Sequence, residues 1–258
     1  MDRKLIICVS FGSSYEETIK KTIDVIESDL KNKFKDYDLR RAFTSPTIIK
    51  KLEKRGIFID SLKAALERAE KDGYEYVYVQ PTHLIAGFEY DKIKETVNSF
   101  ENSFKEIKLG VPLLNDREDV KKVCSVFADE NPFDDDEALI IMGHGTEHDA
   151  DIVYKKAQEV FRHFGYENIF VSTVEGDLSI ENISNKAFKK GYKKAVLIPF
   201  MLVCGEHAAN DMAGDEEDSW KNILISKGFD VRIVFKGMGE YKGVRDLIAE
   251  HLEKLLNY

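Results

Sequence analysis

Short apolar runs alternate with longer amphipathic segments along the whole chain, and this alternation limits the fold more than any other feature of the sequence. Strong β-rich runs lie at about residues 4–10, 75–80, 138–142 and 194–199. Weaker strand candidates lie near residues 38–43, 107–111, 168–174 and 230–235. Strands that alternate with helices form parallel sheets, because a parallel crossover is long enough to hold a helix. We therefore predict an α/β protein with about eight strands.

The two halves of the chain also repeat one another weakly. Residues 6–12 align with residues 139–145, so that two glycines coincide. Residues 79–89 align with residues 197–207, with Pro, Leu and Gly at equal offsets. The second alignment places Glu89 opposite His207. The repeat predicts two related domains, each with a four-stranded parallel sheet flanked by helices.

A proline and an acidic run at residues 131–137 separate the two halves. We place the domain junction there, which gives an N-terminal domain of residues 1–131 and a C-terminal domain of residues 132–258. The last helix is free to pack back on the N-terminal domain. Open α/β sheets bind ligands at the carboxyl ends of their strands, so we expect the active site in a cleft between the two domains.

Charge and cysteine content exclude several classes of protein. The 258 residues include 38 Lys plus Arg and 47 Asp plus Glu, a formal charge of −9, which argues against a nucleic-acid partner. Cys8, Cys124 and Cys204 are spread singly, so the sequence offers neither a disulfide framework nor a Cys-x-x-Cys pair. A reducing compartment is the expectation.

No segment has the pattern of a membrane span or a signal peptide. The longest apolar run, residues 195–205, is interrupted by Pro199 and is shorter than the roughly 20 residues that a bilayer requires. The apolar run of residues 5–11 is short and lacks a cleavage site, so it reads as a first strand. We predict a cytoplasmic protein without a membrane partner, and leave a homo-oligomer open.

The polar segment GHGTEH at residues 143–148 directly follows a predicted strand. It fits the His-x-x-Glu-His pattern of zinc proteases, which needs both histidines on one face of a helix. Glycines flank His144 and a strand precedes it, so we place His144 on a tight loop and reject the protease interpretation. His148 occupies the third glycine position of a nucleotide-binding fingerprint, which therefore fails. We interpret His144 as functional and His148 as a supporting or solvated residue.

Two further strand ends carry ligand-capable side chains. Glu175 leaves a strand edge beside a glycine, and His207 lies in the densest polar cluster of the chain. Two histidines and a carboxylate from three loops could form a mixed nitrogen and oxygen site with open positions, suited to a divalent first-row metal that is held and then released. We interpret the acidic run at residues 215–218 as a solvated helix start and Cys204 as a packed side chain.

Six segments point to one family: residues 11–15 (FGSSY), 42–45 (AFTS), 142–145 (MGHG), 174–175 (VE), 201–213 (MLVCGEHAANDMA) and 218–221 (DSWK). Together they closely resemble the cobalt chelatases of the anaerobic cobalamin pathway, the CbiK family, over the whole chain. The resemblance implies a class II chelatase fold of two similar α/β domains. It also implies ATP-independent insertion of Co(II) into sirohydrochlorin during cobalamin (vitamin B12) synthesis. In that family, the residues that match His144, Glu175 and His207 bind the metal.

Metal insertion must remove two pyrrole N–H protons, so a base is required near the ring. A neutral His144 could bind the incoming ion and accept a proton, a role worth roughly 10²- to 10⁴-fold in rate. We predict that His144, Glu175 and His207 present Co(II) to one ring face. Glu89 and His83 are then expected to line the opposite side, and with His144 they form the predicted catalytic set.

The implied substrate carries eight carboxylates, which an acidic protein repels unless basic residues gather locally. Residues 40–55 contain six Lys and Arg against Glu53 alone. Arg40 and Arg41, as a pair, are predicted to hold the acetate and propionate arms, with helix-surface charge as the alternative. The complete predicted substrate-binding set is Phe11, Ser13, Arg40, Arg41, Ser45, Gly87 and Gly145.

The ligands alone do not fix the metal, because intrinsic affinity rises from iron through cobalt to nickel and peaks at copper. The resemblance implies cobalt, and Co(II) is then a substrate of the reaction. We expect no organic cofactor. Insertion of Fe(II) or Ni(II) in vitro stays open. One alternative is a sirohydrochlorin ferrochelatase that serves sirohaem. Others are a non-catalytic tetrapyrrole or haem carrier and a two-lobed small-molecule binding protein.

Overall fold

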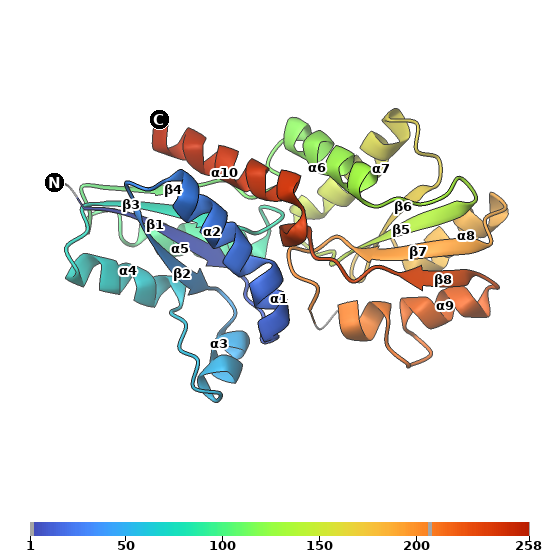
Figure 1. Cartoon of the computed structure of the whole chain (residues 1–258), viewed down its shortest axis with the longest axis horizontal. Helices are drawn as coiled ribbons and strands as arrows, with labels where there is room; N and C mark the ends of the chain where they lie inside the picture. The colour runs from blue at the N-terminus through green and yellow to red at the C-terminus, as the bar shows by residue number, and fades with distance from the viewer. Residues whose placement is uncertain (1–2, 206–207, 258) are drawn as a thin grey trace. The chain divides into compact units, whose positions relative to one another are not determined.

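The computed structural model describes residues 3–205 and 208–257. The chain divides into two compact units, one made of Met1–Asn115 with Lys242–Tyr258 and the other of Asp116–Tyr241. Each unit is built on one four-stranded sheet in which all pairings are parallel. The predicted α/β class with two four-stranded parallel sheets is thereby confirmed (Figure 1).

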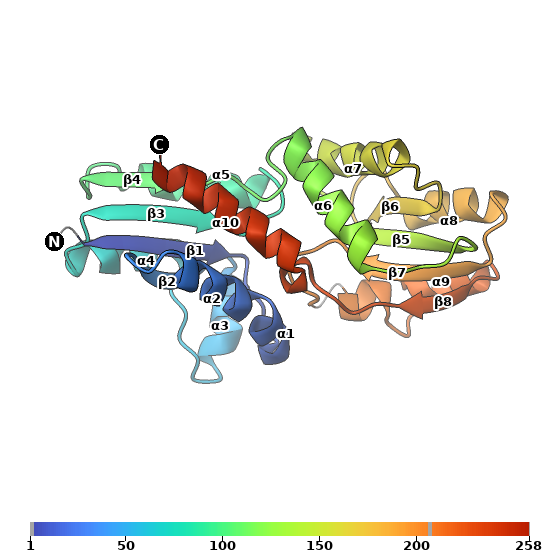
Figure 2. The same cartoon turned by 45° about the horizontal axis from the view of Figure 1, so that its top comes forward.

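The first unit has the strand order β2-β1-β3-β4, and Figure 2 shows β1, β3 and β4 side by side. Its elements are β1 (Lys4–Ser10), α1 (Glu16–Lys21), α2 (Ile23–Lys33), β2 (Asp38–Phe43), α3 (Pro46–Glu53), α4 (Leu62–Lys71), β3 (Tyr76–Pro81), α5 (Phe88–Asn98), β4 (Glu106–Leu109) and α10 (Lys242–Asn257).

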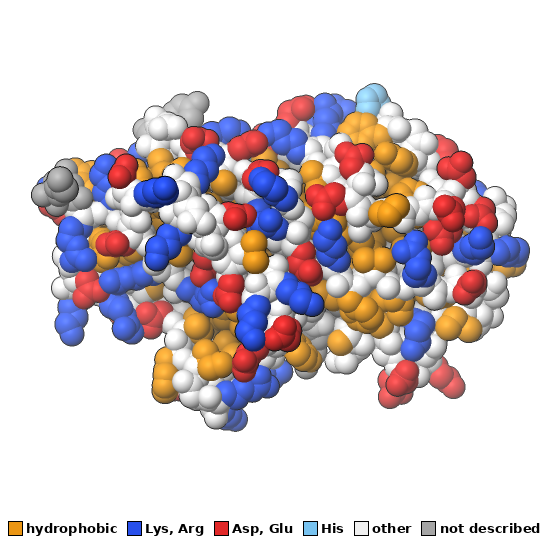
Figure 3. Space-filling view, in the orientation of Figure 1, with side chains coloured by type: hydrophobic (Ala, Val, Ile, Leu, Met, Phe, Trp, Pro, Cys, Tyr) orange, Lys and Arg blue, Asp and Glu red, His pale blue; other side chains and the backbone are white. Residues whose placement is uncertain are grey.

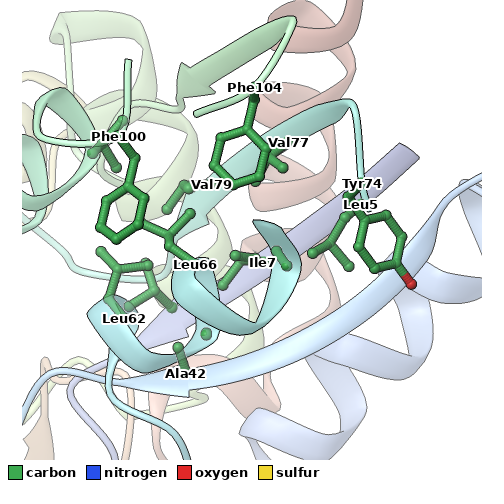
Figure 4. Packing of buried hydrophobic residues seen from close by; sticks show 14 of the residues in the cluster. Leu5, Ile7, Ala42, Leu62, Leu66, Tyr74, Val77, Val79, Phe100 and Phe104 are labelled. Carbon is green, nitrogen blue, oxygen red and sulfur yellow. The ribbon is translucent and has the colours of Figure 1, made fainter. Parts of the chain in front are cut away.

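Alternate residues of the central strands fill the two faces of this sheet. Leu5 and Ile7 of β1 point into a cluster with α4 and α5, where Leu66 lies at its centre (Figure 4). The opposite face is covered by α2 and α10. Because both faces are buried, the strand reads as a continuous apolar run rather than as an alternating one.

The second unit repeats this plan with the order β6-β5-β7-β8. Its elements are α6 (Arg117–Glu130), β5 (Glu137–Gly143), the short 3₁₀ helix η1 (Asp149–Asp151), α7 (Ile152–His163), β6 (Ile169–Thr173), α8 (Ile180–Lys189), β7 (Lys194–Pro199), the π-helix η2 (Ala208–Met212), α9 (Trp220–Ser226), β8 (Asp230–Ile233) and the 3₁₀ helix η3 (Met238–Glu240).

All eight predicted strands are present, and the central ones lie within a residue or so of the predicted bounds. The edge strands β4 and β8 each end two residues earlier than predicted. Backbone pairing continues for one more hydrogen bond, from Gly110 N to Val79 O at 2.8 Å and from Val234 N to Leu197 O at 2.8 Å. In both β4 and β8, the apolar run of the sequence therefore extends slightly beyond the last regular residue of the strand.

The division into units differs from the predicted junction at residues 131/132, because α6 belongs to the second unit. Phe127 of α6 is fully buried, and its ring centroid lies 5.1 Å from that of Phe200 and 5.2 Å from that of Tyr241. The helix therefore contributes its apolar face to the core of the second unit. In turn, α10 is grouped with the first unit, where Leu247 and Leu252 are buried.

Lysine, arginine and carboxylate side chains are interspersed over the face drawn in Figure 3. Many form ion pairs such as Lys33–Glu253, whose Nζ and Oε2 atoms are 2.8 Å apart. Within residues 3–205 and 208–257, the structure contains no helix with the length and apolar character needed to span a bilayer.

Candidate functional site

The backbone of His144 lies next to that of Glu175, because the β5–β6 pairing continues past the ends of both strands. Gly143 and Thr173 are the last regular partners. Beyond them, Val174 N donates to Gly143 O at 3.1 Å and Glu175 N donates to His144 O at 2.8 Å. The structure thus brings two of the predicted metal ligands together on adjacent loops, with His144 half-buried and Glu175 exposed.

The two glycines beside His144 are required by close packing. A Cβ atom on Gly143 would lie 2.3 Å from Cε1 of Tyr154, which is inside the van der Waals distance. Gly145 has φ +78°, and a Cβ there would lie 1.9 Å from the carbonyl oxygen of Glu175. These glycines therefore allow the loop after β5 to sit directly against both α7 and the loop after β6.

Tyr154 of α7 packs against the loop that carries His144. Its side chain is only 2% exposed, and the backbone amides of His144 and Gly145 hydrogen bond its hydroxyl. Burial raises the pKa of the Tyr154 phenol to about 12, so the group stays protonated at neutral pH. Sequence reasoning missed this residue, because an aromatic side chain in an amphipathic helix ordinarily indicates core packing.

The imidazole of His144 is oriented by the backbone. Its Nδ1 atom lies 2.9 Å from the carbonyl oxygen of Gly145, which can only accept a hydrogen bond. Nδ1 must therefore carry the proton when the ring is neutral, and the lone pair resides on Nε2. A histidine fixed in this tautomer by a carbonyl is the usual form of a metal-binding histidine.

His148 has a local structural role. Its Nδ1 atom accepts a hydrogen bond from Ala150 N at 3.0 Å, which caps η1. Asp151 at the end of η1 accepts from Thr146 N at 3.0 Å. His144 lies on a loop and outside any helix, as predicted, so the two histidines do not share the helix face that the protease pattern needs.

The third predicted ligand, His207, lies outside the described residues, as does Glu206. Within residues 3–205 and 208–257, no three His, Cys, Asp or Glu side chains group into a metal site. The predicted set of His144, Glu175 and His207 stays a prediction.

The first unit reproduces the same loop geometry. Thr44 N donates to Ser10 O at 2.9 Å, and Ser45 N donates to Phe11 O at 3.3 Å. Phe11 therefore occupies the place of His144 and Ser45 that of Glu175. Gly12 has φ +99°, as Gly145 has a positive φ, and a Cβ there would lie 2.5 Å from the ring of Phe43.

The predicted substrate-binding residues at this edge differ in exposure. Phe11 is 48% exposed, whereas Ser13 is buried and accepts from Tyr15 N at 3.1 Å. Ser45 caps α3 by accepting from Ile48 N at 3.4 Å, and Gly87 is the residue before α5. Phe11 is therefore one of the exposed aromatic side chains at this edge, together with Tyr15 and Phe88.

His83 follows β3 on the same edge of the first unit. Burial lowers the pKa of its imidazole to about 4, while the charge of Glu89 acts to raise it. The ring is therefore neutral at pH 7. Its Nε2 atom lies 3.4 Å from Oγ1 of Thr44, and Glu89 forms an ion pair with Lys92, with Oε1 and Nζ 2.6 Å apart.

Arg40 and Arg41 lie in the middle of β2 and have carboxylate partners in their own unit. Arg41 Nε donates to Glu27 Oε1 at 2.8 Å, and its Nη2 donates to Glu27 Oε2 at 2.6 Å and to Asp24 Oδ1 at 2.5 Å. These partners raise the pKa of the Arg41 guanidinium above its usual value against the effect of burial. Arg40 pairs with Asp72. A substrate carboxylate at either arginine would have to compete with these ion pairs.

Arg55 is a cation that contacts the strand-end loop after β1. Its Nη1 atom donates to the carbonyl oxygen of Ser14 at 2.6 Å. From the sequence, Arg55 is expected only as one member of the basic segment at residues 40–55. Its position depends on how the loop after α3 returns to the sheet, which sequence periodicity does not report.

Comparison with known families gives a match over nearly the whole chain. The family model described as "Cobalt chelatase (CbiK)" matches residues 4–257. The sirohydrochlorin cobaltochelatase of Salmonella typhimurium is 35% identical over 257 residues, which cover 99% of this chain and 97% of the relative. The sirohydrochlorin cobaltochelatase CbiKC of Nitratidesulfovibrio vulgaris is 29% identical over 256 residues, or 98% and 90% of the two chains.

Solved structures share the fold at lower identity. SirB from Bacillus subtilis with Fe³⁺ superposes with a TM-score of 0.68 at 14% identity, covering 98% of this chain and 95% of that one. The sirohydrochlorin chelatase SirB from Bacillus subtilis subspecies spizizenii in complex with cobalt gives a TM-score of 0.63 at 14% identity, with 99% and 96% covered. These similarities show a chelatase-like fold.

Proposed function

Because the chain belongs to the cobalt chelatase (CbiK) family, we propose that it is a sirohydrochlorin cobaltochelatase, which inserts Co(II) into sirohydrochlorin without ATP on the way to cobalamin. The observation that carries this proposal is the full-length match to the family, together with 35% identity to the Salmonella enzyme. Co(II) and the tetrapyrrole are the two substrates.

His144, Glu175 and His207 are the proposed ligands of the incoming ion. The adjacent backbones of His144 and Glu175, and the Nε2 lone pair that the Gly145 carbonyl enforces, support the first two. Two imidazoles and one carboxylate leave coordination positions open on a divalent first-row ion. Such a site can hold Co(II) and still release it to four ring nitrogens.

Proton transfer follows from the exchange of ligands. The ring gives up two N–H protons for each Co(II) that it accepts, so two protons must leave. Once the ion has passed to the ring, the lone pair of His144 Nε2 can take one of them. Glu89 and His83 are proposed as the second group of acceptors. The imidazole of His83 is held neutral by burial, so it can accept a hydrogen bond, and its lowered pKa makes it a weaker proton acceptor than an ordinary histidine.

Substrate recognition is proposed at the strand-end loops. Phe11 offers an exposed aromatic face to the macrocycle, and Ser13, Ser45, Gly87 and Gly145 shape the surrounding loops. The carboxylate arms need cations, for which Arg40 and Arg41 were predicted. Arg55 joins them, because it contacts the loop that carries Ser14.

The test is anaerobic incubation of the purified protein with sirohydrochlorin and Co(II), followed by the absorption change on metal insertion. Spontaneous insertion is subtracted. His144→Ala should lower kcat/KM at least about 100-fold, the size of a lost base or ligand. His163→Ala removes an exposed histidine at the end of α7 in the same unit, and should keep the rate within about twofold.

Three other outcomes would contradict the proposal. Full turnover in His144→Ala would remove His144 from the mechanism. Faster turnover with Fe(II) than with Co(II) under matched conditions would favour the ferrochelatase. Binding of the ring with no acceleration of insertion by the wild-type protein would indicate a carrier.

A further inference from the structure

The first unit contains a hollow of about 480 Å³ between the C-terminal end of α2 and the start of β2. This volume is within the range of small-molecule sites. The residues that line it are Lys31, Asn32, Lys35, Tyr37, Asp38, Leu39, Arg40 and Tyr74.

The hollow lies at the amino end of the sheet, away from the strand-end loops of the same unit. Asp38 is the first residue of β2, and Arg40 pairs in register with Ile7 of β1. The loops that carry the proposed function begin after Phe43, three residues further along β2. At about 3.3 Å per residue, this is a separation of roughly 10 Å along the strand.

Positive charge dominates the lining. Lys31 and Lys35 are exposed and make no ion pair with any described residue. The only carboxylate in the lining, Asp38, accepts a hydrogen bond from the hydroxyl of Tyr74, with 2.6 Å between the oxygens. The lining thus contains three cations and one carboxylate, although the whole chain has a formal charge of −9.

Arg40 has a donor that the described residues leave unused. Its Nη2 atom is occupied by Asp72, whereas its Nη1 atom is buried and has no hydrogen-bond partner among the described residues. The guanidinium also lies 4.9 Å from the ring centroid of Tyr74, which lines the same hollow. A small rotation would turn the unused N–H towards an acceptor in the hollow, since buried polar groups ordinarily find partners.

We propose that this hollow binds a small multivalent oxyanion through Arg40, Lys31 and Lys35. A planar guanidinium and two flexible ammonium groups match the oxygens of carboxylate or phosphate groups alike. The site belongs to the first unit alone and uses none of the proposed metal ligands. It shares Arg40 with the predicted substrate-binding set, whereas Lys31 and Lys35 belong to neither set, so the lysine variant tests the hollow independently of metal insertion.

The test measures binding of two probes, pyrophosphate and citrate, to the metal-free full-length protein by titration calorimetry at constant ionic strength. Wild type should bind at least one probe at or below about millimolar concentration. Lys31→Gln/Lys35→Gln and Arg40→Gln should each weaken that binding at least about tenfold. The control Lys63→Gln/Lys94→Gln removes two exposed lysines elsewhere in the same unit, and should change affinity less than about twofold.

The two probes also distinguish the source of the oxyanion, because preference for pyrophosphate indicates a phosphate ligand and preference for citrate indicates a polycarboxylate. Lys31→Gln/Lys35→Gln should leave kcat and the KM for sirohydrochlorin unchanged. Failure of both probes to bind, or equal binding by the lysine variants, would overturn the proposal. A raised KM for sirohydrochlorin in the lysine variant would also overturn it, by making the hollow part of the substrate site.

Discussion

At the residue scale, the geometry around His144 depends on two glycines, which have no side chain to occupy the space beside the loop. Gly143 leaves room for the ring of Tyr154, and Gly145 leaves room for the carbonyl of Glu175. The two positions differ, because only Gly145 combines a positive φ with a collision. A matched comparison can therefore separate backbone strain from steric overlap.

Gly145→Ala should lower the free energy of unfolding by about 2–5 kcal/mol, because it adds a left-handed backbone penalty to an overlap with the Glu175 carbonyl. Gly165 also has a positive φ, +88°, but no atom lies within 4 Å of an added Cβ. Gly165→Ala should therefore lower the free energy of unfolding by only about 1–2 kcal/mol. Urea denaturation measures both. Equal losses in the two variants would show that the contact with Glu175 is not tight.

Tyr154→Phe keeps the ring under Gly143 and removes the hydroxyl that the His144 loop uses. We expect about 1 kcal/mol of stability to be lost, and Co(II) binding to the loop to weaken about fivefold. Tyr192→Phe removes a half-buried hydroxyl elsewhere in the second unit and serves as control. Co(II) affinity, measured by competition with a chromophoric chelator, should fall only in the first variant.

The placement of His144 and Glu175 on strand-end loops could be predicted from sequence, because each is a polar side chain that follows an apolar strand, and their role as metal ligands stays a prediction. Tyr154 and Asp151 could not, since nothing in their local pattern shows that they contact the loop backbone. The ion pairs of Arg41 with Asp24 and Glu27 were also beyond reach, because they depend on how α2 lies across β2.

At the scale of elements, the loop between β3 and α5 combines buried and charged groups. His83 is packed near Thr44 at the end of β2, and Glu89 lies in the first turn of α5. Burial and the nearby carboxylate act in opposite directions on the His83 imidazole, and burial dominates.

The pKa of His83, about 4, lies below the ordinary histidine value of about 6.5. The unfolded chain then binds more protons than the folded chain between these two values, so stability falls as pH drops from about 6.5 to 4. The loss reaches at most about 3 kcal/mol. It should shrink in His83→Gln, which urea denaturation at pH 7 and pH 4.5 can measure.

An NMR titration of the His83 ring gives the independent check. Glu89→Gln should lower the pKa of His83 further, because it removes the charge that favours the imidazolium. A wild-type pKa near 6.5 would contradict the burial of the ring. The NMR signals of the exposed His163 in the second unit serve as the internal reference.

The strands were predictable because runs buried on both faces stand out as continuous apolar stretches. The ends of the edge strands β4 and β8 were less predictable, because one ladder hydrogen bond continues past the end of each regular strand. The sheet against which each helix packs was still harder to predict. The apolar stripe of α6 shows that the helix is buried, but not against which sheet.

At the scale of the whole molecule, the first unit is made from two separate stretches of chain. Its last helix, α10, packs against α2 and β3, and is joined to α2 by ion pairs such as Arg245–Asp29, with Nε and Oδ2 2.7 Å apart. The buried side chains of α10 include Leu247 and Leu252. The integrity of the first unit therefore depends on the C-terminus of the chain.

Leu252→Ala should cost about 2–5 kcal/mol, because Leu252 is fully buried. The loss should be confined to the first unit. Hydrogen exchange followed by mass spectrometry should show faster exchange in β1 and β3, with β5 and β7 unchanged. Leu256→Ala, at a half-buried position of the same helix, should have a smaller effect. Equal acceleration in both sheets would mean that α10 does not belong to the first unit alone.

The grouping of α10 with the first unit has a consequence during synthesis. The second unit is continuous and is complete once residue 241 has emerged from the ribosome, whereas the first unit, although it begins the chain, lacks a helix until residue 257 has emerged. At typical elongation rates of about 5–20 residues per second, the nascent first sheet waits roughly 7–28 s for this helix. During this time the apolar surface that α10 will cover is open to chaperones and to other nascent chains, so a stalled or truncated product should aggregate through its N-terminal half.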